Sequence, residues 1–519
     1  MGKTTRNTIL VLALLLLSLP LWSDETFLDL NLQQYDPASG VPIQIKEKLV
    51  ATKAAIVVVD MWDQHWCKTY TARVSNLVPR MNQTLEAARK LGIPIVFAPS
   101  DVAGFYAEYP QRKAMQTVPP YPLPERNTFE PPPQPVGRDR CECGPEQPCP
   151  AGVRVWTRQH KDLVLAENDV LIDCNNAREM LNFCRHNGID TLVYMGVASN
   201  MCVLYRECGM VNMKRYGLKT LFVSDLVEAI TANGIDPASR ETDRNFTPAK
   251  GSAVIQRYIE QHIAPSFESR QLLAAAGVGS QDRRPHIVFV TAEQEYKSEV
   301  TLPAFAQRHL GDDFRYTFLT AESHKGAGRN NVPGLDALYD ADLLVLSMRR
   351  RALPVTQMDH LERFIRAGKP LVALRVSVVP FQLSDPADCP GGHVVWQDFD
   401  EEVLGCHYEG YDSRSRRTGC DVWCAAHVDN HPVLRGLEDA AFHSPSWLYR
   451  LNPLSDTATL LLQGRWSEDA ATEPVAWTNT YNGGRVFYTA LGHWEDFENP
   501  AFNRLLKNAI YWALGKDVP

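Results

Sequence analysis

The sequence lacks any excess of positive charge. Its 519 residues include 53 lysines and arginines against 61 aspartates and glutamates, which gives a formal net charge of −8. Without a basic balance there is no electrostatic footprint for DNA or RNA, so we expect no nucleic-acid partner. Hydrophobic residues at 45% and charged residues at 22% are typical of an ordinary globular protein.

The N-terminus also lacks an apolar run long enough to form a typical membrane-spanning helix. The apolar run Ile9 to Leu17 is shorter than the roughly 20 residues that a spanning helix needs. It follows two basic residues and precedes Ser23, which is the three-part order of a secretory signal peptide. We predict that residues 1–23 are a signal peptide and that the protein is periplasmic or secreted. An uncleaved segment would instead tether it to a membrane.

Histidine is absent from the neighbourhood of the densest cysteine group. Cys141, Cys143 and Cys149 lie in a proline-rich stretch with little helix or strand pattern, which we interpret as an insertion loop. No histidine completes a zinc set of usual spacing, so we expect disulfides among these cysteines and predict no metal or other cofactor. An oxidising compartment favours that interpretation, and the pairing stays open. We interpret Cys406, Cys420 and Cys424 in the same way, as disulfide-forming cysteines.

The chain is longer than one hydrophobic core usually serves, so we predict two domains. Residues 45–265 alternate strand and helix patterns, as βαβ units do. The predicted strands are 54–59, 93–98, 169–173, 191–195 and 218–223, and the predicted helices are 77–91, 177–186, 201–215 and 251–262. The proline-rich segment 101–151 interrupts them and is expected to be a lid, a binding loop or a disordered insert.

Residues 266–284 are small and polar enough to be a linker, and a second α/β pattern fills residues 285–517. Its predicted strands are 286–291, 314–319, 341–347 and 371–375, and its predicted helices are 300–310 and 357–367. The fold class that follows is α/β, with two doubly wound Rossmann-like three-layer α/β/α domains and mainly parallel sheets.

The chemistry-bearing stretch of the first domain is Asp190-Thr-Leu-Val-Tyr-Met-Gly-Val-Ala-Ser-Asn-Met-Cys202-Val203, an apolar strand that stops at a glycine turn and restarts as a helix. A helix start concentrates unpaired N–H groups and positive charge, so we expect a lowered thiol pKa at Cys202. Asp60 ends the strand 54–59 and should lie at the same sheet edge. The alternative is a buried, inert thiol, but the joint pattern favours a reactive pair.

These residues resemble the isochorismatase-like cysteine hydrolases, which include nicotinamidases and related amidases. The resemblance covers about 50–265 and is carried by Val57-Val-Val-Asp60-Met61 and Gly196-Val-Ala-Ser199-Asn-Met-Cys202-Val203. It implies that Cys202 attacks a small amide to form a thioester, and that Asp60 shuttles the proton. It also implies an oxyanion hole from the N–H groups of Ala198 and Cys202, and a cis peptide bond between Val197 and Ala198.

The family's third catalytic residue, a lysine, has no counterpart at the expected strand end, where the chain has Leu163-Val-Leu-Ala-Glu167-Asn-Asp169. Lys161 is the nearest lysine. It is either the catalytic lysine displaced or, as we prefer, a solvated charge. Glu167 or Arg158 could fill the role instead.

Four residues are predicted to contact the substrate: Trp62, His65, Ser199 and Asn200. Asp63 and His65 have the Asp-x-His spacing of metal ligands, but the family's metal ligands come from a later stretch, so we prefer substrate contact. A hydrogen-bonded loop histidine explains His65 about as well. Trp62 and Trp66 either shape an apolar pocket or close the core.

In the second half, motifs include Thr291-Ala-Glu293-Gln-Glu295-Tyr296, Leu371-Val-Ala-Leu-Arg375 and Gly484-Arg-Val-Phe-Tyr-Thr-Ala-Leu-Gly-His493-Trp494. Over about 285–516 they resemble the ThuA-like (trehalose-utilisation) family, which has the class I glutamine amidotransferase fold and is associated with sugar metabolism. The resemblance implies a ligand cleft with Glu293, Tyr296, Arg375 and His493.

The second half departs from its family at two places. Leu346-Ser-Met-Arg349-Arg-Arg351 replaces the nucleophile elbow of an amidotransferase, so we expect no glutaminase activity. The histidine that often follows the strand-end arginine is absent after Arg375. The triplet Arg349 to Arg351 could bind an anionic or sugar-acid ligand, although a solvated face is the commoner role of surface arginines.

Together these features predict an exported cysteine hydrolase that cleaves a carbon–nitrogen bond of a small-molecule amide and carries a domain for carbohydrate recognition or processing. A homo-oligomer is compatible with the sequence. One alternative is a non-catalytic carbohydrate-binding or scaffold protein with a degenerate hydrolase domain. Another is activity in the second domain alone, on an oxidised sugar.

Overall fold

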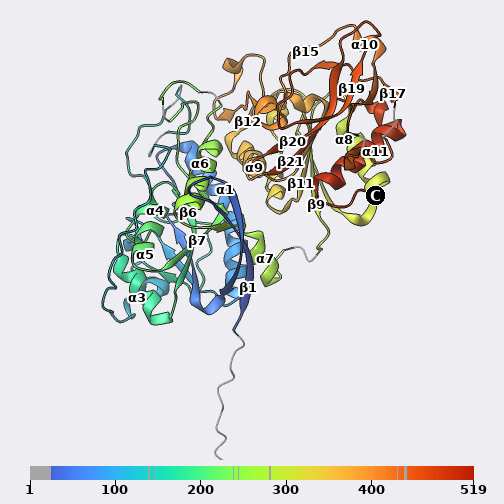
Figure 1. The fold of residues 1–519 in the computed structure, drawn as a ribbon. Coiled ribbons are helices and arrows are strands. Elements are labelled where there is room, and N and C mark those ends of the chain that lie inside the picture. Colours follow the sequence, from blue (N-terminus) through green and yellow to red (C-terminus); the bar gives the residue numbers. More distant parts are fainter. Residues whose placement is uncertain are drawn as a thin grey trace, which may run out of the picture.

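The computed structural model describes residues 25–137, 141–145, 148–237, 239–243, 245–279, 282–428, 430–437 and 441–519. It consists of two α/β domains, each built on one large sheet (Figure 1). The predicted signal peptide, 1–23, lies outside the described residues. Within those residues, no helix is long and apolar enough to cross a membrane.

The first sheet has the strand order β2-β1-β8-β7-β6-β3-β4-β5. Its six neighbouring parallel strands are β8 (Ser266–Phe267), β7 (Lys219–Glu228), β6 (Thr191–Val197), β3 (Ala54–Val59), β4 (Ile95–Ala98) and β5 (Val170–Leu171). The antiparallel hairpin of β1 (Phe27–Tyr35) and β2 (Pro42–Val50) extends the sheet beyond β8.

The first domain is larger than the predicted 45–265. It begins with the hairpin β1–β2, and it includes β8 and α7 (Arg270–Ala276), which fall in the predicted linker 266–284. β8 pairs with both β7 and β1, and Leu272 and Leu273 are buried in the domain core. A two-residue strand and a helix ending in three alanines have too weak an apolar pattern to be distinguished from a linker.

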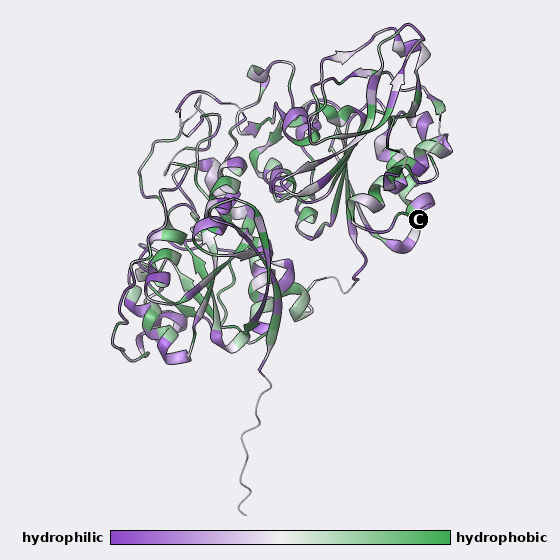
Figure 2. Ribbon diagram, viewed as in Figure 1, coloured by the Kyte–Doolittle hydropathy of each residue, from purple (hydrophilic) through white to green (hydrophobic). Residues whose placement is uncertain are grey.

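Helices cover both faces of the first sheet. On one face lie α1 (Lys68–Lys90) and α7, and on the other α3 (Ala177–Asn187), α5 (Met210–Arg215) and α6 (Pro248–His262). Successive residues of β3 therefore point into different cores, Ile56 toward α1 and Val57 toward α3, and the continuous apolar run 54–59 reflects this double burial. Figure 2 shows the hydrophobic strands between more hydrophilic outer helix faces.

The helix predicted at 201–215 is broken into α4 (Cys202–Tyr205) and α5. Gly209 lies at the break, where the chain folds back so closely that a Cβ would lie 2.8 Å from the carbonyl group of Leu204. Helical periodicity continues across the break, and the sequence pattern alone could not show it. α1, in contrast, is longer than predicted, because it begins at Lys68 instead of residue 77.

The second sheet is half parallel. Its order is β10-β9-β11-β13-β21-β20-β19-β16-β17. The parallel strands are β10 (Arg315–Thr320), β9 (His286–Ala292), β11 (Leu343–Met348), β13 (Leu371–Leu374) and β21 (Gly484–Thr489). The antiparallel extension consists of β20 (Glu473–Tyr481), β19 (Thr459–Arg465), β16 (Cys420–Cys424) and β17 (Ala441–Ser444). α9 (Val355–Arg366) covers one face, and α8 (Ser298–Phe305) and α11 (Pro500–Ala513) cover the other.

Smaller elements complete the chain: α2 (Pro110–Gln116), α10 (Ser415–Thr418), and the paired short strands β12 (Leu353–Pro354) with β14 (His393–Val394) and β15 (Gly410–Tyr411) with β18 (Tyr449–Arg450). The predicted α/β class with two Rossmann-like domains is confirmed, and the antiparallel half of the second sheet is the part that the sequence did not reveal.

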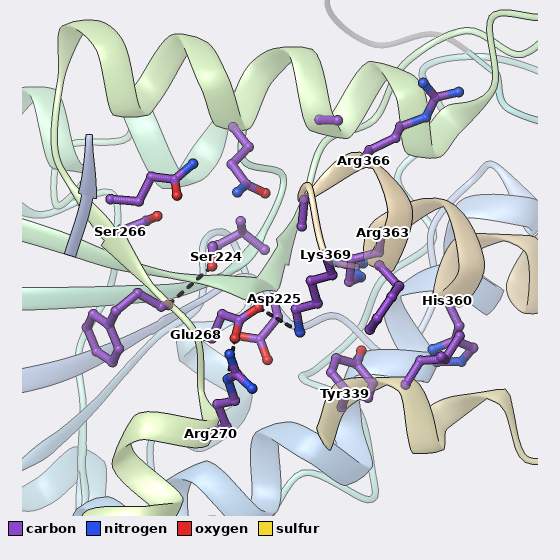
Figure 3. A pocket seen from close by; sticks show the side chains of 18 of the residues that line it. Ser224, Asp225, Ser266, Glu268, Arg270, Tyr339, His360, Arg363, Arg366 and Lys369 are labelled. Carbon is purple, nitrogen blue, oxygen red and sulfur yellow. Dashed lines mark hydrogen bonds and ion pairs between the residues drawn. The ribbon is translucent and has the colours of Figure 1, made fainter. Parts of the chain in front are cut away.

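The two domains meet along α9, which packs against α1 and α6 (Figure 1). Ion pairs cross this boundary, among them Arg73 with Asp359 at 2.6 Å and Lys369 with Glu268 at 2.8 Å. A cleft of about 960 Å³ between the domains is lined mainly by charged and polar side chains, with Lys369 and Arg270 both directed at Glu268 (Figure 3). None of the predicted catalytic residues Asp60, Cys202 and Lys161 lines it.

Candidate active site

Three neighbouring strands of the first sheet bring the candidate catalytic groups together. Asp60 follows β3 directly, Cys202 follows the turn after β6, and Ser100 follows β4. The Asp60 carboxylate accepts hydrogen bonds from the Ser100 hydroxyl at 2.8 Å and from the Ser100 backbone N–H, and it is hydrogen-bonded to the Cys202 thiol. The sheet topology therefore forms the Asp60–Cys202 pair that the sequence predicted.

The Asp60 carboxyl is completely buried, and this burial raises its pKa to about 6, although hydrogen bonds with Cys202 and Ser100 act in the opposite direction. A carboxyl group with a pKa near neutrality can both accept and return a proton at physiological pH. Asp60 thus has the properties that a proton shuttle requires.

The predicted low pKa of Cys202 is wrong. Burial raises the pKa of this thiol well above its ordinary value, the nearby Asp60 charge raises it further, and Arg206 only partly opposes both. The helix that follows, α4, has four residues and so contributes little of the dipole that the prediction relied on. Cys202 therefore rests as a neutral thiol that is hydrogen-bonded to Asp60.

Arg206 is the cation beside the thiol, and sequence reasoning missed it. Its guanidinium group is hydrogen-bonded to the Cys202 side chain and also donates to Asn175 at 3.1 Å. Lys161 is exposed and neighbours His160, which agrees with a solvated charge. Arg158 and Glu167 are exposed as well. The spacing from Cys202 to Arg206, about one helical turn, is the signal that could have identified it.

The turn between β6 and α4 is held tightly. The Val197–Ala198 peptide bond is cis, the form that the family resemblance implied. Gly196 has a φ of +116°, and a Cβ there would lie 2.0 Å from the carbonyl oxygen of Val59. The Ser199 N–H donates to the Glu228 carbonyl at 2.7 Å, and the Asn200 amide both donates to and accepts from the backbone of Ile230. Asn200 thus helps to fix the turn, while the oxyanion hole of Ala198 and Cys202 stays a prediction.

Aromatic rings form a wall beside Asp60. Trp62 stacks on Trp156 with 4.5 Å between ring centroids, and His65 lies parallel to Trp156 at 5.8 Å. The Nε1–H groups of both tryptophans are buried and have no hydrogen-bond partner among the described residues. Burial lowers the pKa of His65 to about 4, so its ring is neutral. These features leave two buried indole donors near Asp60. Trp156 was missed because it lies in the irregular stretch between the predicted insertion and β5.

The cysteine predictions need correction. Cys141, Cys143 and Cys149 do not form disulfides with one another, and Cys406, Cys420 and Cys424 are not disulfide-bonded either. The disulfide found in the described part of the chain joins Cys174 to Cys208. These two residues lie in the loops before α3 and before α5, which pack together on one face of the sheet, a proximity that residue spacing does not reveal.

At the carboxyl edge of the second sheet, three of the four predicted cleft residues come together. Arg375 donates to the Tyr296 hydroxyl at 3.2 Å and lies 4.3 Å from the centroid of its ring, and the His493 ring lies 5.9 Å from Tyr296. Glu293 instead closes the loop before α8, because its carboxylate accepts the backbone N–H groups of Tyr296 and Ser298.

The triplet Arg349 to Arg351 does not form a solvated surface, which is the commoner role of arginines. Arg349 pairs with Glu295 at 2.6 Å, and Arg351 is only 2% exposed. Burial, reinforced by Arg329, lowers the pKa of Arg351 to about 10. Its Nε and one terminal nitrogen have no hydrogen-bond partner among the described residues.

Comparison with known families agrees with both resemblances. Residues 54–250 match the isochorismatase domain, and residues 287–513 match the ThuA domain of trehalose utilisation. The chain therefore joins an isochorismatase-like hydrolase domain to a ThuA domain. No curated protein matches the chain.

The solved structures to which the chain is similar are distant from it. A ThuA-like protein from Parabacteroides merdae is 15% identical to this chain, with a TM-score of 0.33. The match covers 46% of this chain and 92% of the Parabacteroides merdae protein. A cysteine hydrolase from Pseudomonas syringae pv. phaseolicola is 14% identical with a TM-score of 0.28, covering 44% of this chain and 95% of its own. The assignment of the two domains rests on the family matches.

Replacing Arg206 by glutamine should slow alkylation of Cys202 by iodoacetamide roughly 10- to 100-fold at neutral pH, because the thiolate loses a charged hydrogen-bond partner. The apparent pKa of alkylation should rise. Peptide mass spectrometry against pH measures both, with Lys161→Gln as the matched control, for which we expect the wild-type rate. Equal rates for Arg206→Gln and wild type would contradict the assignment.

Proposed function

We propose that the first domain hydrolyses a carbon–nitrogen bond of a small amide through a thioester on Cys202. The observation that carries this proposal is the buried Asp60–Cys202 pair beside Arg206, at the strand edge of an isochorismatase domain. The two indole N–H groups of Trp62 and Trp156 suit a planar substrate with hydrogen-bond acceptors.

In the proposed reaction, the Asp60 carboxylate takes the thiol proton as the Cys202 sulphur bonds to the acyl carbon. The resulting oxyanion is held by the N–H groups of Ala198 and Cys202. When the carbon–nitrogen bond breaks, Asp60 returns its proton to the leaving amine or ammonia. Water then attacks the thioester with Asp60 again as base, which releases the acid and restores the thiol. Arg206 stabilises the sulphur while it carries negative charge.

Ammonia release from a panel of small primary amides tests this proposal. The wild type should turn over at least one aliphatic or heteroaromatic amide, whereas Cys202→Ala should show none above background. Brief incubation with that amide should add one acyl mass to the intact wild-type protein. Release that persists undiminished in Cys202→Ala would contradict a Cys202 thioester.

A second candidate function belongs to the ThuA domain, for which we infer recognition of an anionic carbohydrate such as a sugar acid. The supporting observation is that Arg351 and Arg375 are both buried and that each has an Nε without a partner among the described residues. Such groups are costly unless a ligand pairs with them. In calorimetric titrations we expect sugar acids to bind and their neutral parent sugars to bind at least tenfold more weakly, with the difference lost in Arg351→Met. Equal affinities would contradict this role.

We also propose that the protein is exported. The Cys174–Cys208 disulfide supports this, because such bonds persist mainly in oxidising compartments. Cell fractionation with N-terminal sequencing should find a chain that begins just after residue 23. An intact, cytosolic N-terminus would contradict export.

A further inference from the structure

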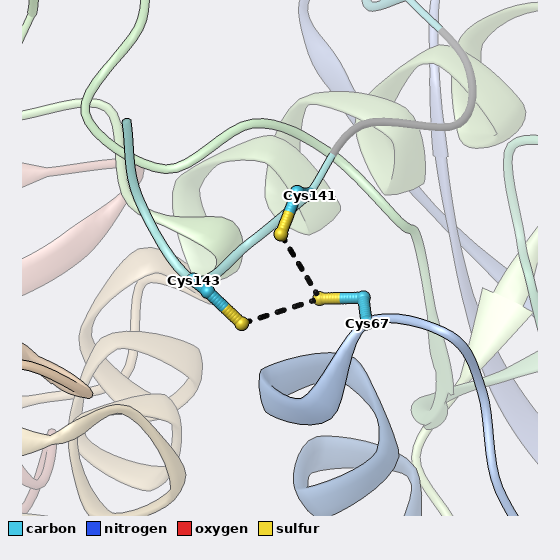
Figure 4. A group of neighbouring side chains, drawn as sticks. All are labelled: Cys67, Cys141 and Cys143. Carbon is cyan, nitrogen blue, oxygen red and sulfur yellow. Dashed lines mark hydrogen bonds between the residues drawn. The ribbon is translucent and has the colours of Figure 1, made fainter. Parts of the chain in front are cut away.

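Four cysteines from two distant parts of the chain converge at the start of α1. Cys67 directly precedes that helix, and Cys141, Cys143 and Cys149 belong to the insertion. The sulphur of Cys67 lies 3.8 Å from that of Cys143 and 3.9 Å from that of Cys141, and the three sulphurs all lie within 4.8 Å of one another (Figure 4). Cys149 extends the group, with its sulphur 3.5 Å from that of Cys143.

These separations fit one chemistry well. In a tetrahedral site with zinc–sulphur bonds of about 2.3 Å, neighbouring sulphurs lie about 3.8 Å apart. A disulfide would require about 2.05 Å and joins sulphurs only in pairs, whereas here Cys67 has two near neighbours and Cys143 has two. The same structure does form a disulfide elsewhere, between Cys174 and Cys208.

Hydrogen-bond donors surround the sulphurs. The backbone N–H of Glu142 donates to Cys67, that of Cys149 donates to Cys141, and the Thr69 hydroxyl donates to Cys143, each at 3.2 Å. In the first turn of the 23-residue helix α1, backbone groups of Lys68, Thr69 and Tyr70 are also hydrogen-bonded to sulphurs of the cluster. Donors in these positions can hydrogen-bond to metal-bound sulphurs and so orient them, and a disulfide has no need of them.

We propose that Cys67, Cys141, Cys143 and Cys149 together bind one zinc ion in a closed, structural site. Four thiolate ligands leave no open position for water or substrate, so the metal takes no part in the hydrolysis. Zinc binding draws the sulphur of Cys149 toward the other three. The absence of a nearby histidine misled the sequence analysis, because the missing ligand is a cysteine 74 residues before Cys141.

The proposed zinc ion would link the insertion to the segment that begins at Asp60 and contains Cys67. Cys67 lies two residues after His65, in the segment that begins at Asp60. On the insertion side, Glu142 lies between two ligands, and its carboxylate is held by Arg73 and by the N–H of Thr231. Shortly after the insertion comes Trp156, which stacks on Trp62. A metal here would therefore hold both segments that carry the stacked rings Trp62 and Trp156, without itself touching Asp60 or Cys202.

Metal analysis of the full chain tests the proposal. Protein purified without chelator should contain one zinc per chain by inductively coupled plasma mass spectrometry. Reduced, metal-free protein titrated with Co²⁺ should reach its end point at one equivalent, with the sulphur-to-cobalt charge-transfer absorption of a thiolate site. Absence of stoichiometric Co²⁺ binding would overturn the site. So would peptide mapping without reduction that finds these four cysteines in two disulfides.

Variants assign the ligands. Cys143→Ser should lose most of its zinc, whereas Cys184→Ser, which removes a buried free thiol outside the cluster, should keep one equivalent. Full zinc content in Cys143→Ser would overturn the assignment. If that variant fails to fold, the Co²⁺ titration of the wild type still decides the question, and neither measurement depends on hydrolytic activity.

Discussion

Asp60→Asn should lower kcat/KM for amide hydrolysis by a factor of about 10²–10⁴, the usual contribution of a general base. The loss should be large because burial leaves Cys202 as a neutral thiol that cannot attack until its proton has a destination. In the wild type, kcat/KM should rise with pH through the pKa of Asp60 near 6, since the base form is required. That ascending limb should vanish in Asp60→Asn, and steady-state rates across pH measure both effects.

The same substitution should stabilise the protein at neutral pH. The folded pKa of Asp60 is raised from 3.8 to about 6, so ionisation of this buried group opposes folding. The protonated Asp60 carboxyl contributes its full share to the free energy of unfolding below the unfolded pKa, and this share is lost as pH rises through 6. Above that pH the loss is about 3 kcal/mol. Asparagine does not ionise, so the urea midpoint of Asp60→Asn should exceed that of the wild type at neutral pH, and the difference should fade near about pH 4.

Asp63→Asn serves as the control for both measurements. Asp63 is part of the same segment, but its carboxylate accepts hydrogen bonds from Thr157 and the side chain is more exposed. We expect a small change in kcat/KM and a urea midpoint near that of the wild type. A wild-type profile that stays flat between pH 4 and 7, or an Asp60→Asn variant with wild-type turnover, would refute the role of Asp60 as base.

The parts of the site that sequence predicted are those set by parallel-sheet geometry. Strand 54–59 and the glycine turn at Gly196 each point to a carboxyl edge, and adjacent strands β3 and β6 place Asp60 beside Cys202 without further information. Alternating strands and helices likewise gave both domains. The family resemblance added the cis peptide, which no local pattern reveals.

The parts that failed depend on how the loops fold. The cation beside Cys202 is Arg206, about one helical turn after it, instead of a lysine at the strand end before α3, and Cys67 joins a cysteine cluster far along the chain. The pKa of Cys202 was predicted from its position at a helix start, but burial and the Asp60 charge outweigh a four-residue helix. Each error concerns which groups the folded loops bring near a residue, and the patterns that predict strands and helices do not describe those loops.

Arg73 on α1 should be the most destabilising single charge to remove. Its side chain is fully buried and pairs with Glu142 of the insertion at 2.8 Å, with Asp359 of the second domain at 2.6 Å and with Glu228 at the end of β7. Burial raises the pKa of Glu142 to about 7 and that of Asp359 to about 6, and Arg73 opposes both shifts. Three buried carboxyl groups from three parts of the protein thus pair with Arg73, and of these Glu228 is also paired with Arg363.

Arg73→Met should therefore lower the free energy of unfolding by about 3–5 kcal/mol at neutral pH, the usual result of leaving buried charges without a partner. Lys90→Met on the same helix is the matched control, because Lys90 forms only an exposed pair with Glu86 and should change stability by less than about 0.5 kcal/mol. Urea midpoints measure both variants. Lowering the pH should return part of the loss in Arg73→Met, since the abandoned carboxyl groups can then protonate. A midpoint equal to that of Lys90→Met would show that the carboxyl groups are neutral in the folded protein and that Arg73 is not what holds the two domains and the insertion together.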